Sequence, residues 1–181
     1  MRILHTRVMG LSSVVSLLIV CASSLAVSPP EAPEALRPPA DQVLALEANA
    51  TGVQIYKCGA NKDQPERFEW ALKAPEAELS DKTGRKIGKH YAGPTWESTD
   101  GSTVVGAVKA RADSPDPSAI PWLLLSAKSN SGTGVFSQIK SIQRLQTVEG
   151  KPPSAPCGRD NAQQVVRVPY RAVYYFYAAK Q

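Results

Sequence analysis

Histidine and cysteine are scarce in this chain of 181 residues, which has two histidines and three cysteines. Catalytic and structural zinc sites usually need several His or Cys ligands, and His90 is the only histidine beyond the N-terminal region. The sequence also has no spaced acidic loop for calcium, no phosphate-binding glycine loop and no nucleophile elbow. We therefore expect no bound metal and no cofactor.

Long apolar runs and clusters of basic residues are also missing. The net charge of +5 is spread along the chain, which argues against nucleic acid as a partner because nucleic acid binding needs a clustered basic surface. The one extended apolar run, Val8–Val20, is broken by serines and is shorter than the roughly 18 residues that a membrane span requires. We expect no transmembrane helix in the mature chain.

The N-terminus has the pattern of a secretion signal. A basic head with Arg2 and Arg7 precedes the apolar run, and the small residues of Ser24-Leu25-Ala26 follow it. This order predicts a cleavable signal peptide over residues 1–26. The protein is then exported, to the periplasm or to the outside of the cell. An alternative is a lipoprotein anchored through Cys21, although Val20 is bulkier than the residue that normally precedes an acylated cysteine.

Two cysteines, Cys58 and Cys157, remain after cleavage. An even number of cysteines in an exported chain favours a disulfide. Closing a loop of about 100 residues contributes about 4–5 kcal/mol in the chain-entropy description. We therefore predict a Cys58–Cys157 bond.

Residues 27–40 contain five prolines, which is incompatible with a regular helix or a central strand. We interpret this stretch as an extended tether and residues 41–181 as one folded domain.

The apolar pattern of residues 41–181 has a period of two, which is typical of strands. It is clearest near the C-terminus, where Val166, Tyr170 and Tyr174 lie on one face and Arg167 and Arg171 on the other. Several such runs separated by turns predict an all-β domain, a β-sandwich or a barrel-like antiparallel sheet, with at most one short helix. Residues 136–147 fit a helix or a strand equally well.

One polar and aromatic segment could carry chemistry. His90 could act as a general base with Glu97 or Asp100 as partners, or the two carboxylates could flank a glycosidic bond. The alternative is structural: His90 bonds to a loop, Trp96 packs in the core and Asp100 caps a hairpin turn. We weight the structural alternative more heavily, because a lone histidine is unspecific.

The strand pattern also predicts the positions of three further aromatic residues. Trp70 is expected in the core because it lies on an alternating apolar face. Tyr175 and Tyr177 lie on the arginine side of the last strand, where they could stack on a sugar or on another protein. The alternative for these two tyrosines is that they belong to a second covered face of the sheet.

Several short motifs occur in a fixed order along the chain. They are Gly52-Val53-Gln54-Ile55-Tyr56-Lys57-Cys58, His90-Tyr91-Ala92-Gly93-Pro94-Thr95-Trp96-Glu97, Asp100-Gly101-Ser102, Ile120-Pro121-Trp122-Leu123-Leu124, Ile142-Gln143-Arg144-Leu145 and Pro156-Cys157. In this combination the chain resembles domain of unknown function family 3455, a group of mostly secreted small proteins. The resemblance implies no activity and no catalytic residues.

Two functions therefore stay open at this point. The first is a non-enzymatic exported module that binds a glycan or a surface protein, or contributes to the cell envelope. The second is a hydrolase that acts on a cell-wall or extracellular polymer through His90, Glu97 or Asp100. Convergence of these three side chains in a cleft would favour the hydrolase, and dispersed, packed side chains would favour the binding module.

Overall fold

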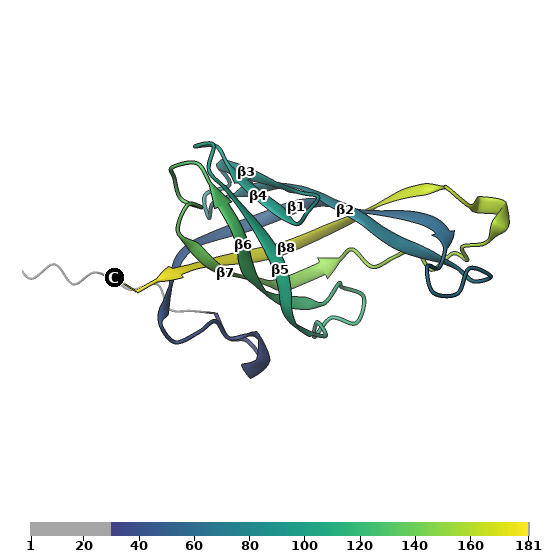
Figure 1. Cartoon of the computed structure of the whole chain (residues 1–181), viewed down its shortest axis with the longest axis horizontal. Helices are drawn as coiled ribbons and strands as arrows, with labels where there is room; N and C mark the ends of the chain where they lie inside the picture. Colours follow the sequence, from purple (N-terminus) through teal and green to yellow (C-terminus); the bar gives the residue numbers. More distant parts are fainter. Residues whose placement is uncertain (1–29, 181) are drawn as a thin grey trace, which may run out of the picture.

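Eight antiparallel strands form the body of the protein in a computed structural model that describes residues 30–180 (Figure 1). The elements are η1 (Glu34–Leu36), β1 (Gln42–Ala60), β2 (Phe68–Ser80), β3 (Lys86–Tyr91), β4 (Thr95–Ser98), β5 (Thr103–Ala112), β6 (Trp122–Ser131), β7 (Ile139–Glu149), η2 (Arg159–Asn161) and β8 (Val165–Ala179). The all-β prediction is confirmed. The ambiguous stretch at 136–147 is mostly the strand β7.

Each strand pairs with the next one along the chain, and β1 pairs with β8. The β1–β8 pairing extends from Gln42↔Ala179 to Lys57↔Val165, so the sheet closes on itself. Of the two architectures that the sequence left open, the structure is therefore a barrel.

The barrel has two different ends. The turns at 81–85, 99–102 and 132–138 lie at one end, which we call the closed end because the buried ring of Phe136 fills it. The loops at 113–121 and 150–164 lie at the other end, which we call the open end. Beyond the open end, β1, β2 and the start of β8 extend away from the barrel body (Figure 1).

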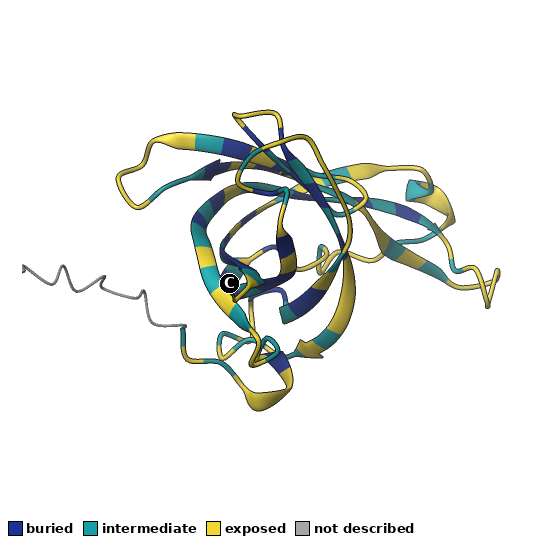
Figure 2. Cartoon of the chain, turned by 60° about the vertical axis from the view of Figure 1, so that its left-hand side comes forward, coloured by how far each residue is buried: buried dark blue, intermediate teal, exposed yellow. Residues whose placement is uncertain are grey.

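Alternation along the strands divides the side chains between the interior and the outside of the barrel, and Figure 2 shows buried and exposed residues succeeding one another along the strands. On β8 the interior residues are Tyr170, Ala172, Tyr174 and Phe176, as the pattern predicts. Trp96 packs edge-on against Tyr174 with ring centroids 5.3 Å apart. Gly106 makes room for this indole, since a Cβ atom there would lie 2.9 Å from the Trp96 ring.

A second cluster lies on the outside of the barrel, under the N-terminal segment. Its buried members are Leu36, Leu124, Leu145, Tyr175 and Tyr177. Gln143 links the layers, because its Nε2 donates to the Leu36 carbonyl and its Oε1 accepts from the Tyr177 hydroxyl, both at 2.6 Å. Tyr175 and Tyr177 thus belong to a second covered face and are not available for sugar stacking.

The same cluster changes the interpretation of the proline-rich segment. Of the tether expected at 27–40, residues 30–40 are described, and they carry the short helix η1 with Leu36 fully buried. This part of the segment therefore differs from an extended tether, because one apolar side chain anchors it to the barrel.

The predicted disulfide is present. Cys58, near the end of β1, is bonded to Cys157, and their Cα atoms are 5.6 Å apart. Since β1 and β8 are neighbours, the bond joins the loop before β8 to the first strand beyond the open end.

The expectations for the N-terminus concern residues outside the described part of the chain. The signal peptide at 1–26 and the alternative acylation site at Cys21 both lie there. Among residues 30–180, no helix has the length and apolar character needed to cross a membrane.

Candidate functional site in the barrel interior

The barrel wall is incomplete between β2 and β5. β3 and β4 are short, so β2 pairs with β3 only over Ala77–Ser80 and β5 pairs with β4 only over Thr103–Val105. The remaining lengths of β2 and β5 have no neighbouring strand on this side. Two large apolar side chains flank the gap and are strongly exposed, Leu72 at 53% and Val108 at 59%. Exposed apolar side chains at such an opening are typical of a binding site.

A cavity enters the barrel through this gap and through the open end. Its outer chamber has a volume of about 680 Å³ and is lined by residues that include Tyr56, Trp70, Arg111, Ile120 and Lys151. Its inner chamber has a volume of about 270 Å³ and is lined by residues that include His90, Pro94, Trp96, Leu125 and Tyr174. The two chambers are adjacent, since Gln54, Leu72, Val108, Leu123 and Arg144 line both of them.

Arg144 brings a positive charge into this cavity. It lies two residues after the buried Ile142 on β7, so alternation places both side chains on the interior face. Its Nε and Nη2 donate to the Pro121 carbonyl at 3.2 and 2.8 Å. Among residues 30–180 it makes no ion pair.

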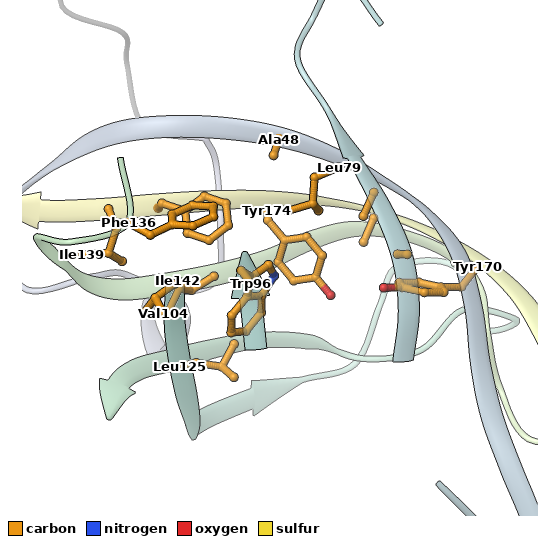
Figure 3. Close-up of a cluster of buried hydrophobic side chains, with 14 of the residues drawn as sticks. Ala48, Leu79, Trp96, Val104, Leu125, Phe136, Ile139, Ile142, Tyr170 and Tyr174 are labelled. Carbon is orange, nitrogen blue, oxygen red and sulfur yellow. The ribbon is translucent and has the colours of Figure 1, made fainter. Parts of the chain in front are cut away.

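Polar atoms without hydrogen-bond partners are concentrated around Arg144. Gln54 Nε2 and Trp96 Nε1 are buried and have no partner among the described residues, and the buried hydroxyls of Tyr170 and Tyr174 make no hydrogen bond of regular geometry there, although each influences the pKa of the other. Figure 3 shows the two tyrosine hydroxyls pointing toward one another from β8. Burial raises the pKa of both tyrosines, so both hydroxyls stay protonated at neutral pH. Buried polar groups are normally paired, and an unpaired group costs about 1–3 kcal/mol.

His90 is part of the inner wall. Its ring stacks on Trp96 with centroids 4.4 Å apart, and its Nδ1 donates to the Thr95 carbonyl at 2.8 Å. Burial lowers the pKa of His90 to about 3, the Thr95 bond opposes this shift, and the charge of Arg144 adds to it. His90 is therefore a neutral imidazole. Its contacts with Thr95 and Trp96 agree with the structural interpretation and not with a general base.

Glu97 points away from the cavity. In the β3–β4 pair His90 lies opposite Trp96, whereas Glu97 lies opposite Lys89, on the other face of the sheet. Glu97 accepts a hydrogen bond from the Tyr91 hydroxyl at 2.9 Å and forms an ion pair with Lys89 at 3.2 Å. These two contacts lower the pKa of its carboxyl group.

Asp100 is in a third place, at the closed end. Its carboxylate accepts bonds from the Ser102 hydroxyl, the Ser102 amide and the Val135 amide at 2.6, 2.8 and 2.9 Å. These bonds, the Ser102 hydroxyl first, lower its pKa to about 2. The structure thus brings none of His90, Glu97 and Asp100 together, and within the described residues no group of three His, Cys, Asp or Glu side chains could hold a metal ion.

Sequence reasoning missed the residues that form the cavity. In the sequence, Gln54 and Arg144 stand out only as parts of motifs. Gln54 lies two residues before the buried Tyr56, and Arg144 lies two residues after the buried Ile142. Trp70 is not in the core as expected: it is half-buried, lines the outer chamber and donates from Nε1 to the Ala155 carbonyl at 2.9 Å. The sequence signal that would have indicated the site is a polar residue at an interior position of an alternating strand.

The fold and cavity define a class of protein: an eight-stranded antiparallel barrel with an internal chamber that is open at one end and along one side. The family described as "Protein of unknown function (DUF3455)" matches residues 39–178, and the chain belongs to it. This agrees with the resemblance found in the sequence motifs. No curated protein matches the chain, and no solved structure matches it.

Proposed function

We propose that this protein is an exported, non-enzymatic module that binds a small molecule inside its barrel. The observation that carries the proposal is the inner chamber, where apolar walls surround buried hydrogen-bond donors that have no partner among the described residues. Ligand sites in proteins are typically apolar cavities with a few placed polar groups. An eight-stranded barrel is just wide enough to hold one small ligand.

Export is supported by the disulfide, because such bonds persist mainly in oxidising compartments outside the cytosol. The secretion pattern of residues 1–26 supports it independently. Of the partners considered from the sequence, a surface protein or a glycan needs an exposed polar or aromatic surface. The cavity, whose walls include Leu72, Leu123 and Leu125, suits a small apolar molecule better.

The hydrolase alternative has less support. Glycoside hydrolysis needs two carboxyl groups that flank one bond, one of them an acid with a raised pKa. Glu97 and Asp100 lie in different places, and both have lowered pKa values. His90 is buried between its wall partners and stays neutral.

Binding can be tested with the fluorescent apolar probe 1-aminoanthracene. We expect a saturable rise in its fluorescence at one probe per protein. Val108→Trp places an indole at the gap and should weaken probe binding at least tenfold. Val165→Trp is the matched control, because Val165 is similarly exposed at 55% but does not line either chamber. Absence of saturable binding, or equal losses in the two variants, would overturn the proposal.

A further inference from the structure

Arg144 brings a positive charge to the inner chamber, and among the described residues it forms no ion pair. A guanidinium group has five N–H donors, and the two bonds to the Pro121 carbonyl use two of them. The inner chamber has no Asp or Glu among the described residues that line it. The groups that feel the charge of Arg144 are His90 and the tyrosines Tyr56, Tyr170 and Tyr174, all uncharged at neutral pH. Burial of a charge is costly unless the charge is paired.

The unpartnered atoms next to Arg144 have the same polarity. Gln54 Nε2 and Trp96 Nε1 can only donate hydrogen bonds, and the protonated Tyr174 hydroxyl is free to donate one as well. The side chains of Gln54, Trp96 and Tyr174 are each exposed by only 1%, so bulk water does not satisfy them. The inner chamber therefore combines a cation with several free donors, and a complementary ligand brings oxygen acceptors and a negative charge.

The walls limit the rest of the ligand. Leu123, Leu125 and Val108 line the inner chamber together with the rings of Trp96 and Tyr174. Arg144 is the one cation there that is not at the rim, because Lys73 is an exposed residue. The single positive charge of the half-buried Arg144 balances one negative charge, so a dianion such as a phosphate monoester would leave a net charge in an apolar space.

We infer that the inner chamber binds a small monocarboxylic acid with an apolar body, and that Arg144 is the residue that selects the carboxylate. This inference rests on the proposed function and deepens it by naming the ligand class. The planar guanidinium matches the two oxygens of a carboxylate. The hydroxyl of Tyr174 and the N–H groups of Gln54 and Trp96 supply further donors around it, and the leucines contact the apolar body.

A pair of nearly isosteric probes tests the charge alone. Naphthalene-2-carboxylate and naphthalene-2-carboxamide have the same ring system and differ in the negative charge. By isothermal titration calorimetry at neutral pH, the wild-type protein should bind the carboxylate at least tenfold more tightly than the amide. Equal affinities would overturn the inference without any variant, and binding of 1-aminoanthracene would show that the proposed function survives.

Variants then assign the preference to Arg144. Arg144→Met should bring the affinities for the carboxylate and the amide to within about threefold of each other, whatever its effect on either affinity alone. Arg171→Met, on the exposed outer side of β8, is the matched control and should keep the full preference. A preference that persists in Arg144→Met would overturn the role of Arg144.

Arg144→Met also loses the bonds to the Pro121 carbonyl, so its fold is checked by circular dichroism and by its melting temperature. The pair Arg144→Lys and Arg144→Gln gives a second measurement, because both lose the guanidinium fork and only the first keeps a charge. We expect the lysine variant to prefer the carboxylate at least threefold more than the glutamine variant does. An equal preference in the two variants would contradict charge recognition at this position.

Discussion

In the turns at the closed end of the barrel two carboxylates are fully paired, whereas in the interior toward the open end several polar groups are not. Asp81 and Asp100 each bind the backbone and hydroxyl groups of their own turns, and the pKa of each carboxyl is lowered to about 2, with the hydroxyl bond from Thr83 or Ser102 as the first cause. Gln54 and Tyr174, deeper toward the open end, have donors without partners. The comparison teaches that the turns at the closed end contribute to stability, whereas the unpaired donors of the interior are the groups that the proposed ligand would pair.

Phe136 should produce the largest loss of stability at the closed end. Its ring is 1% exposed and packs on Phe176 with centroids 4.7 Å apart. We expect Phe136→Ala to lower the free energy of unfolding by about 3–5 kcal/mol, measured by urea denaturation. Its neighbour Val135 is 51% exposed, and Val135→Ala should cost less than about 0.5 kcal/mol. Similar small losses in the two variants would contradict the claim that the Phe136 side chain is tightly packed at the closed end.

The disulfide should have the next largest effect, because it holds the extension beyond the open end. Cys58→Ser, Cys157→Ser and the double variant should each lose about 2–5 kcal/mol of stability, since each breaks the same bond. Chemical denaturation of the three variants measures the losses. A double variant with the summed loss of the two single variants would mean that the cysteines contribute separately.

His90 should make stability depend on pH in a defined direction. Its pKa is about 3 in the folded protein because of burial, against 6.5 as the ordinary value. Between these two pH values the unfolded chain binds a proton that the folded protein excludes, so the free energy of unfolding falls as the pH falls from 6.5. The slope is at most about 1.4 kcal/mol per pH unit.

The range from pH 6.5 to 5.5 isolates this effect, because exposed carboxylates in the unfolded chain titrate below it. Urea denaturation across this range should show a clear slope for the wild-type protein and a much smaller slope for His90→Phe. Identical slopes for the two proteins would show that His90 is not the buried neutral group described here.

A small effect on stability is expected at Tyr174. Tyr174→Phe removes a buried hydroxyl without a partner and keeps the ring that packs on Trp96. Removal of an unsatisfied polar group is near neutral or stabilising, so we expect a change of less than about 0.5 kcal/mol. A loss of more than about 1.5 kcal/mol in thermal or urea unfolding would mean that the hydroxyl is paired in the free protein.

The sequence predicted the strands better than it predicted the site. Alternation identified β8 and its interior residues, because Tyr170, Tyr174 and Phe176 are separated by even numbers of residues and therefore lie on the same face of the strand. Barrel closure could not be derived, since the β1–β8 pairing depends on contacts between the two ends of the chain. The sequence did not predict the cavity, because it does not show which face of each strand is interior. Gln54 and Arg144 are unusual only as polar residues on the interior face.

The proposed catalytic candidates show why spacing alone is a weak guide to a site. His90 and Glu97 are close in the sequence, yet the β3–β4 hairpin sends them to opposite faces of the sheet. Leu36 gives the complementary case, because a proline-rich composition hides the one side chain that anchors the N-terminal segment to the barrel.

One titration tests the comparison between the two ends most directly. In heteronuclear NMR spectra of the isotope-labelled protein, naphthalene-2-carboxylate should shift the Arg144 Nε–H and Trp96 Nε1–H signals in a saturable way. The amides of Ser102 and Val135, which Asp100 already binds at the closed end, should stay in place. Saturable shifts at Ser102 and Val135 with unchanged Arg144 and Trp96 signals would contradict the binding chamber proposed for the barrel interior.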